Sequence, residues 1–184
     1  REMLLVNAET SNSIAVTSIQ PRTFTNFALP ANQGNYLIIT NESLLTGANG
    51  SHPVEDYKTY RSSAAGGGFN TKIYLIDQLV DQFAFGIKMH PESVRNFLRW
   101  ARATYTNPVK NAFLIGRGVQ YGHNRINEAN PLLSKLMFVP TFGYPASDNL
   151  LAAEPGINGT PKTPIGRLSV ITPEEITVYL DKVK

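Results

Sequence analysis

Three short apolar runs recur along the chain and predict buried strands. They are continuous rather than alternating, which is typical of strands covered on both faces. The intervals between them are long enough for helices, so the pattern predicts an α/β fold. We expect a mainly parallel sheet with helices on both faces and a flavodoxin-like, doubly wound order in which the first strand lies between the other two. The runs are Tyr36–Thr40, Lys72–Ile76 and Ala112–Ile115.

Two further segments are weaker strand candidates. Leu136–Val139 is a short apolar run, and Ile165–Leu168 follows Pro164. Because proline cannot donate a hydrogen bond to a neighbouring strand, Pro164 indicates an edge position for the second candidate.

Helical periodicity appears after three prolines that suit a first helical turn, at Pro53, Pro91 and Pro173. Apolar residues three and four positions apart form one face of each helix, which is expected to pack on the sheet. Glycines 66–68 end the first helix, and no such stop follows the last one. The predicted inward faces are Val54, Tyr57 and Arg61; Val94, Phe97, Leu98 and Ala101; and Ile176, Tyr179, Leu180 and Val183.

Residues 1–34 differ from the rest of the chain because their short apolar runs are separated by Asn, Ser, Thr and Pro without helical period. We interpret them as a β-like extension, the tail of a preceding β-rich region. Residues 35–184 form the α/β unit. The chain opens at Arg1 and its last helix reaches Lys184, so we expect it to be part of a longer protein.

Composition limits the chemistry. The chain carries 17 basic and 14 acidic groups, a net charge of +3, and the basic residues are scattered, so no nucleic-acid partner is expected. No apolar run approaches the roughly 20 residues that span a bilayer. The chain has no cysteine, which excludes disulfides and a thiol nucleophile from these residues.

The segment Gly116–Gly122 superficially offers a glycine-rich phosphate loop. Such a loop must run directly into a helix, whereas residues 123–131 are rich in helix breakers and are predicted to form a loop. His123 is therefore expected to be a loop histidine, since it lacks the nucleophile that a catalytic base requires. No serine lies in a nucleophile-elbow motif. We expect no catalytic residue and no cofactor in this chain.

A calcium site is the one metal hypothesis that the residues leave open. Asp77 and Asp81 stand four apart, and Asp148 precedes Asn149. These are hard oxygen ligands of the kind that Ca²⁺ prefers. Lone carboxylates in loops more often cap helices, so both interpretations remain.

One unit is specific enough to compare with a known family. From Ile73 to Leu98 a strand is followed by two aspartates, a phenylalanine, a glycine and then Pro-x-x-x-Arg-x-Phe-Leu. This order resembles the gingipain-type cysteine peptidases, a family that includes the maturation peptidase of the type IX secretion system. Further landmarks of the resemblance are Asn35–Thr40, Tyr60–Arg61, Phe113–Gly116, Val139–Thr141, Ser147–Asp148, Ile165–Ser169 and Tyr179–Lys182.

The resemblance implies tandem α/β units with a caspase-like fold, of which residues 35–184 match the first, non-catalytic unit. The catalytic histidine and cysteine of such peptidases belong to the second unit, expected downstream of residue 184. It also implies a secreted or surface-exposed bacterial cysteine endopeptidase as the parent protein. Two departures, Arg117 and Asn149, stand where many relatives have acidic residues, which puts an acidic ligand cluster in doubt.

Loops after the carboxyl ends of parallel strands form the working edge of such a sheet. We expect this edge to contact the downstream catalytic unit of the same chain or its protein substrates. Phe142, Tyr144, Leu150 and Leu151 are expected to be exposed there, unless their loop folds back on its own core. The predicted edge residues are Asn41, Asp77, Arg117, His123, Phe142, Tyr144, Asp148 and Asn149.

The sequence leaves two alternatives to a scaffold unit of a peptidase. A non-catalytic binding or assembly module of a surface or secretion-system protein fits the same residues, and the sequence does not separate it from the scaffold. A free-standing nucleotide or phospho-switch domain is disfavoured, because the first strand ends in Asn41-Glu42 rather than in an acidic pair.

Overall fold

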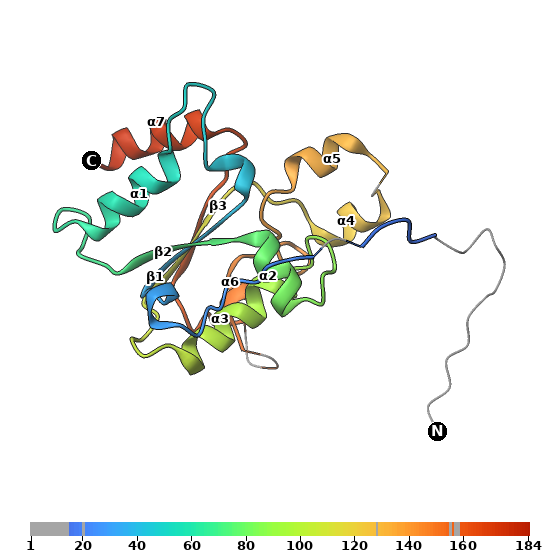
Figure 1. The fold of residues 1–184 in the computed structure, drawn as a ribbon, viewed down its shortest axis with the longest axis horizontal. Coiled ribbons are helices and arrows are strands. Elements are labelled where there is room, and N and C mark those ends of the chain that lie inside the picture. Colours follow the sequence, from blue (N-terminus) through green and yellow to red (C-terminus); the bar gives the residue numbers. More distant parts are fainter. Residues whose placement is uncertain (1–14, 20, 128, 155, 157–158) are drawn as a thin grey trace.

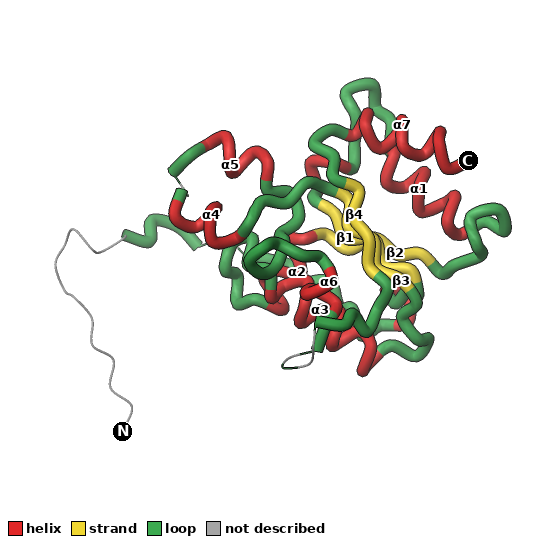
Figure 2. Tube along the Cα trace, turned by 180° about the vertical axis from the view of Figure 1, so that it is seen from behind, coloured by secondary structure: helices red, strands yellow, loops and turns green. Residues whose placement is uncertain are grey.

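The computed structural model describes residues 15–19, 21–127, 129–154, 156 and 159–184. Within them the chain forms one sheet of four parallel strands in the order β2-β1-β3-β4 (Figures 1 and 2). The predicted α/β fold with a parallel sheet is therefore confirmed. The strands are β1 Tyr36–Thr40, β2 Thr71–Leu75, β3 Asn111–Ile115 and β4 Ile165–Leu168.

The first strand lies inside the sheet because the chain crosses to one side of it and then to the other. Ile38 of β1 is paired with Ile73 of β2 and with Phe113 of β3, which is the doubly wound order expected from the sequence. The fourth strand is an edge strand, as Pro164 predicted. The carbonyl of Pro164 accepts a hydrogen bond from the backbone N–H of Ala112 at 2.9 Å.

Helices cover both faces of the sheet, so the domain has three layers (Figure 1). Helices α1 and α7 pack on one face, and helices α2, α3 and α6 pack on the other. The fourth and fifth lie beyond the carboxyl ends of the strands, at the right of Figure 1. The α-helices of the described residues are α1 Pro53–Ser62, α2 Ile76–Phe83, α3 Glu92–Thr104, α4 Tyr121–Ile126, α5 Pro131–Leu136, α6 Asn149–Ala152 and α7 Pro173–Val183; 3₁₀ turns lie at Pro30–Asn32 and Glu42–Leu44.

Each face of the sheet has its own hydrophobic cluster, because successive side chains of a strand point to opposite faces. Leu37 and Ile39 of β1 lie in the cluster beneath α2, α3 and α6. Ile38 lies in the cluster beneath α1 and α7. All three side chains are fully buried, and each contributes about 1.5–3 kcal/mol to folding. This double burial explains why the strand is apolar at every position.

The predicted inward faces of α3 and α7 are confirmed. Val94, Phe97, Leu98 and Ala101 of α3 are all fully buried. In α7, Ile176 and Leu180 are buried, while Tyr179 and Val183 pack against them from the margin. The α7 helix begins where the sequence predicts it: the hydroxyl of Thr172 accepts a hydrogen bond from the N–H of Glu175 at 3.4 Å.

The prediction of a loop over residues 123–131 is wrong, because α4 and α5 occupy most of this stretch. Asn124 lies inside α4, whereas Asn127 follows its end and Asn130 and Pro131 stand at the start of α5. Pro131 is the first residue of α5, and the side-chain oxygen of Asn130 accepts a hydrogen bond from the N–H of Leu132 at 3.0 Å. His123 consequently lies on α4, with an exposed side chain.

The predicted strand over Leu136–Val139 is also wrong. Leu136 ends α5, and the following residues cross the end of the sheet without joining it. The backbone N–H groups of Phe138 and Val139 both donate to the carbonyl of Arg117, at 2.9 and 3.2 Å. The apolar character of this run reflects packing against the strand ends.

The β-like extension expected over residues 1–34 lies partly outside the described residues. In the described part, residues 15–19 and 21–34, there is no strand. This part packs on the α/β unit: Phe27 is 5% exposed and stacks among Tyr74, Phe83 and Phe97. Because Phe27 completes the cluster beneath α2 and α3, residue 34 does not mark a break in packing.

Two pairs of buried tyrosines cross-link the elements through their hydroxyl groups. Tyr105 donates to Tyr74 at 3.1 Å, and the hydroxyls of Tyr36 and Tyr57 also lie 3.1 Å apart. Burial, followed by these hydroxyl contacts, raises the pKa of Tyr57 and Tyr74 well above the ordinary value of 10.0. Burial raises the pKa of Tyr105 to about 12.

These pKa shifts predict a loss of stability in alkali. Above pH 10 the unfolded chain releases its tyrosine protons while the folded chain retains those of Tyr57, Tyr74 and Tyr105. The free energy of unfolding should therefore fall from about pH 10 upward, by about 1.4 kcal/mol per pH unit for each of these tyrosines. Urea melts from about pH 9 to 11.5 measure it. A free energy of unfolding that does not change over this range would contradict the assignment.

The helix face of α3 predicts a contrast between two neighbouring substitutions. Phe97→Ala should lower the free energy of unfolding by about 3–5 kcal/mol, because it leaves a cavity between the helix and the sheet. Arg99→Ala should cost about 0–1 kcal/mol, because it removes a partly exposed ion pair with Glu154 and a long hydrogen bond to the carbonyl of Ala153. Urea denaturation of both variants ranks them, and the reverse order would show that the helix is rotated.

Candidate functional site

The carboxyl edge of the sheet is organised around one buried guanidinium group, that of Arg167 in β4, whose side chain is 9% exposed. Its Nε and Nη2 atoms donate to the two carboxylate oxygens of Asp148 at 2.8 and 2.7 Å. Nη1 donates to the carbonyls of Gly116 and Val139 at 2.8 and 2.9 Å. Nη2 also donates to the carbonyl of Pro140 at 2.9 Å. These contacts use all the donors of the group.

Arg167 thereby joins three segments that are far apart in the sequence. Gly116 follows β3, Val139 and Pro140 follow α5, and Asp148 precedes α6. The bidentate pair with Asp148 fixes the direction of the guanidinium plane as well as its charge. The loops at this edge are therefore held in one arrangement by a single side chain.

The crevice beside the first and third strands is where doubly wound proteins commonly bind ligands. Here the chain itself fills that place. Gly116 has a φ of +131°, and a Cβ atom added to it would lie 2.8 Å from Cβ of Phe138. The hydroxyl of Thr141 donates to the carbonyl of Val119 at 3.0 Å, and the amide of Asn41 reaches the carbonyl of Phe138 at 3.5 Å. A nucleotide phosphate has no room at this crevice.

The carboxylates that the sequence indicated for calcium are paired with arginines. Asp81 on α2 forms an ion pair with Arg22, and Asp148 is held by Arg167. Asp77 is exposed on the first turn of α2. Among the described residues, no group of three or more His, Asp or Glu side chains is arranged to hold a metal ion.

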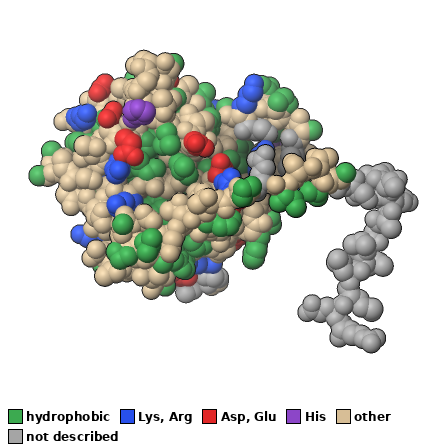
Figure 3. Space-filling view, viewed as in Figure 1, with side chains coloured by type: hydrophobic (Ala, Val, Ile, Leu, Met, Phe, Trp, Pro, Cys, Tyr) green, Lys and Arg blue, Asp and Glu red, His purple; other side chains and the backbone are tan. Residues whose placement is uncertain are grey.

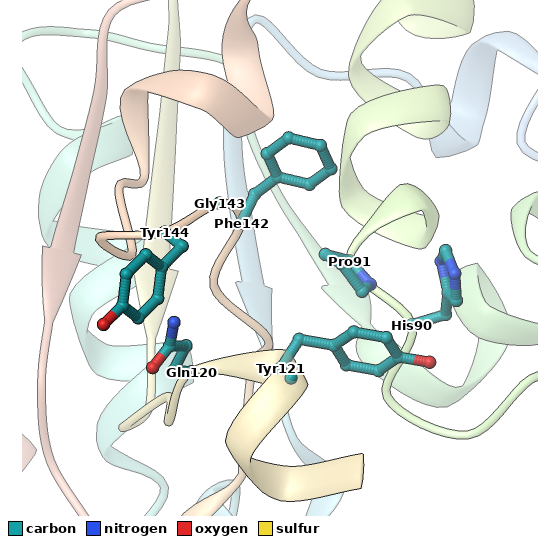
Figure 4. Close-up of a pocket in the computed structure, with 8 residues that line it drawn as sticks. His90, Pro91, Gln120, Tyr121, Phe142, Gly143 and Tyr144 are labelled. Carbon is teal, nitrogen blue, oxygen red and sulfur yellow. The ribbon is translucent and has the colours of Figure 1, made fainter. Parts of the chain in front are cut away.

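A pocket of about 530 Å³ opens next to the closed crevice. It lies between the start of α3, the start of α4 and the turn at residues 142–144 (Figure 4). Tyr121 extends toward His90 on one side, and Tyr144 lies over Gln120 on the other (Figure 4). Its lining residues are His90, Pro91, Gln120, Tyr121, Gly122, Phe142, Gly143 and Tyr144.

Three arginines of α3 contact the turn at Phe142, which forms one wall of this pocket, and the residues that follow it. The guanidinium carbon of Arg95 lies 4.7 Å from the centre of the Phe142 ring. Arg102 pairs with Glu154 and donates to the hydroxyl of Thr163 at 3.3 Å. Burial, followed by the positive charge of Arg95, lowers the pKa of Arg99. Phe142, Glu154 and Thr163 are thus each held against α3 by an arginine.

The predicted apolar surface over residues 142–151 is only partly correct. Tyr144 is 89% exposed, as expected. Leu151 is fully buried in the cluster beneath α3, so the expectation that it is exposed is wrong. Phe142 and Leu150 are partly buried. The reason is α6, a short helix that turns Leu151 and Ala152 toward α3.

The structure brings some of the predicted edge residues together and leaves others apart. Asp148 reaches Arg167, and Phe142 and Tyr144 line the pocket. Arg117 and Asn149 are exposed, and the backbone carbonyl of Arg117 accepts a hydrogen bond from the N–H of Phe138. Sequence reasoning missed Arg167 as the central residue, and it missed the pocket residues on α4. The only signal was the Ile-Gly-Arg-Leu segment, which places a charged residue inside a strand.

The distribution of charged and apolar residues over the described part of the chain does not indicate a further binding site. On the face drawn in Figure 3, basic and acidic side chains are interspersed and do not form one basic patch. No helix in the described part of the chain is long and apolar enough to cross a membrane.

Comparisons with known proteins give two findings. The profile of peptidase family C25 matches residues 29–184. The crystal structure of dimeric latent PorU from Porphyromonas gingivalis is similar in fold, with a TM-score of 0.58 and 19% sequence identity. That match covers 83% of this chain and 16% of the PorU chain. The comparison with curated protein sequences gives no significant match.

The contacts of Arg167 predict a large cost for its removal. Arg167→Ala leaves the carboxylate of Asp148 and three carbonyls without their donor, so the free energy of unfolding should fall by about 3–5 kcal/mol. Arg117→Ala is the matched control: its side chain is exposed, and the change should stay within about 0.5 kcal/mol. Urea denaturation measures both, and equal effects would show that Arg167 does not organise the edge.

Proposed function

The chain belongs to peptidase family C25, and from this premise we propose that it is a non-catalytic α/β unit that supports the catalytic half of a cysteine endopeptidase. The observation that carries the proposal is the absence of cysteine from all 184 residues. A thiol peptidase needs a thiolate nucleophile, so a chain of this family without one acts on substrates only through another unit.

The geometry of the carboxyl edge supports this role. Its crevice is filled by residues 137–141, and Arg167 fixes the surrounding loops. A surface that is held rigidly before association loses little conformational freedom when a partner packs on it. Such an edge suits the placing of a neighbouring catalytic unit better than it suits the binding and release of a small substrate.

The parent protein, in this proposal, is secreted or displayed on the outer surface of a bacterium, like the gingipain-type peptidases that the sequence resembles. Its partner is a catalytic unit of the same protein that carries the histidine and the cysteine. Protein or peptide substrates are bound through that unit. The edge residues Asn41, Asp77, Arg117, His123 and Asn149 are the proposed contacts with it.

The proposal predicts that the purified 184-residue chain hydrolyses no peptide ending in Arg or Lys, because it lacks a nucleophile. A longer product of the same gene that contains a cysteine should hydrolyse peptides and should be inactivated by iodoacetamide. Release of a fluorogenic leaving group measures both. Cleavage by the 184-residue chain, abolished by a substitution within it, would overturn the proposal.

The supporting role has a separate test in that longer product. Asp148→Asn weakens the hold of Arg167 on the edge, so kcat/KM should fall at least about tenfold while the number of titratable thiols stays constant. Thr177→Ala, on the exposed side of α7, is the control and should leave kcat/KM unchanged. If Asp148→Asn also leaves kcat/KM unchanged, the edge does not support catalysis.

A further inference from the structure

The pocket between α3, α4 and the 142–144 turn is lined mainly by rings. Four of its eight lining side chains are aromatic, those of His90, Tyr121, Phe142 and Tyr144, and Pro91 adds a fifth ring. None of the lining residues is Asp, Glu, Lys or Arg. Its volume of about 530 Å³ lies within the ~300–1,000 Å³ range of ligand sites. The pocket therefore suits an uncharged ligand with flat apolar surfaces.

The same lining offers several hydrogen-bond donors. Within the described part of the chain, the side-chain amide of Gln120 and the hydroxyls of Tyr121 and Tyr144 make no hydrogen bond to another residue. The Nδ1 atom of His90 accepts a hydrogen bond from the N–H of Glu92 at 3.2 Å, so the ring proton lies on Nε2. A ligand that enters this pocket can accept these donors, which favours one rich in carbonyl groups.

Three of the four aromatic rings are held by other residues before any ligand arrives, and the fourth, Tyr144, is exposed. The rings of His90 and Tyr121 meet edge to face with centres 5.0 Å apart. Arg95 holds the ring of Phe142, and the carbonyl of Phe142 accepts from the N–H of Ser147 at 2.7 Å. Asp148, next in the chain, is bound by Arg167. Rings that are already held in place lose little side-chain freedom when a ligand binds.

We propose that this pocket binds an extended, proline-containing peptide segment in the polyproline II conformation. Such a segment has no internal hydrogen bonds, so all its carbonyls are free to accept from the donors of the pocket. Its proline rings present flat apolar faces to Tyr121, Phe142 and Tyr144, as in other aromatic-lined grooves that recognise proline-rich segments. The site is independent of the proposed peptidase role, because it needs no catalytic unit.

Other ligand classes fit the pocket less well. A phosphate or carboxylate ligand is best held by Lys or Arg, and the lining has neither. A helical peptide uses its carbonyls internally, so it would leave the donors of the pocket without partners. A proline-rich extended segment satisfies both the rings and the donors.

Titration of the full 184-residue chain with an acetylated, amidated octaproline peptide tests the proposal. Saturable binding is expected by fluorescence anisotropy of a labelled peptide, and the backbone amide resonances of Gly122 and Gly143 should shift. A glycine-serine peptide of the same length should not bind. No saturable binding of octaproline up to about 2 mM, or equal binding of the glycine-serine peptide, would overturn the proposal.

Three substitutions localise the binding. Tyr144→Ala and Tyr121→Ala should each weaken octaproline binding at least about tenfold. Phe85→Ala is the control: Phe85 is 96% exposed and does not line the pocket, so the affinity should stay the same. Tyr144 is so exposed that its variant keeps the native fold, which urea denaturation checks. Unchanged binding by the Tyr144→Ala variant would show that the peptide binds elsewhere.

Discussion

The guanidinium of Arg167 is the contact on which the carboxyl edge of this domain depends. It carries five N–H donors in one plane, and each finds an oxygen: two on Asp148 and one each on the carbonyls of Gly116, Val139 and Pro140. An arginine side chain that is 9% exposed is tolerated only because its charge and all its donors are satisfied. The three segments it joins must therefore keep their positions relative to β4.

This arrangement decides what the sheet edge can do. In a doubly wound sheet the crevice beside the central strands is the usual ligand site. Residues 137–141 fill it here and pack closely on Gly116, which adopts a conformation that favours glycine. Space opens farther out, where α4 and the 142–144 turn face the start of α3, and beside the ends of β1 and β2, where Glu42, Leu75 and Asp77 line a second pocket. The edge is thus closed at its centre and open at both flanks.

Membership of peptidase family C25 and the absence of cysteine give this geometry its context. A closed, rigid edge is consistent with a unit that supports chemistry performed elsewhere. The aromatic pocket at the flank serves a different purpose in our proposal, the recognition of an extended peptide. Tyr121 and Tyr144 line the pocket, whereas Arg167 and Asp148 hold the loops of the edge, among them the segment that follows the 142–144 turn.

The sequence by itself determined the sheet and its layers. Strands buried on both faces must be apolar throughout, and helices packed on them must be apolar at intervals of three and four, so β1, α3 and α7 were readable from composition and period alone. Short helices were not readable in this way: α4 and α5 span six residues each, too few for a period, and Asn127, Asn130 and Pro131 stand at their ends. Long-range partners were equally hidden. Only the tertiary structure placed Asp148 beside Arg167, Phe27 in the core and Leu151 beneath α3. These contacts join residues that lie far apart in the sequence, and no local sequence pattern indicates that they meet.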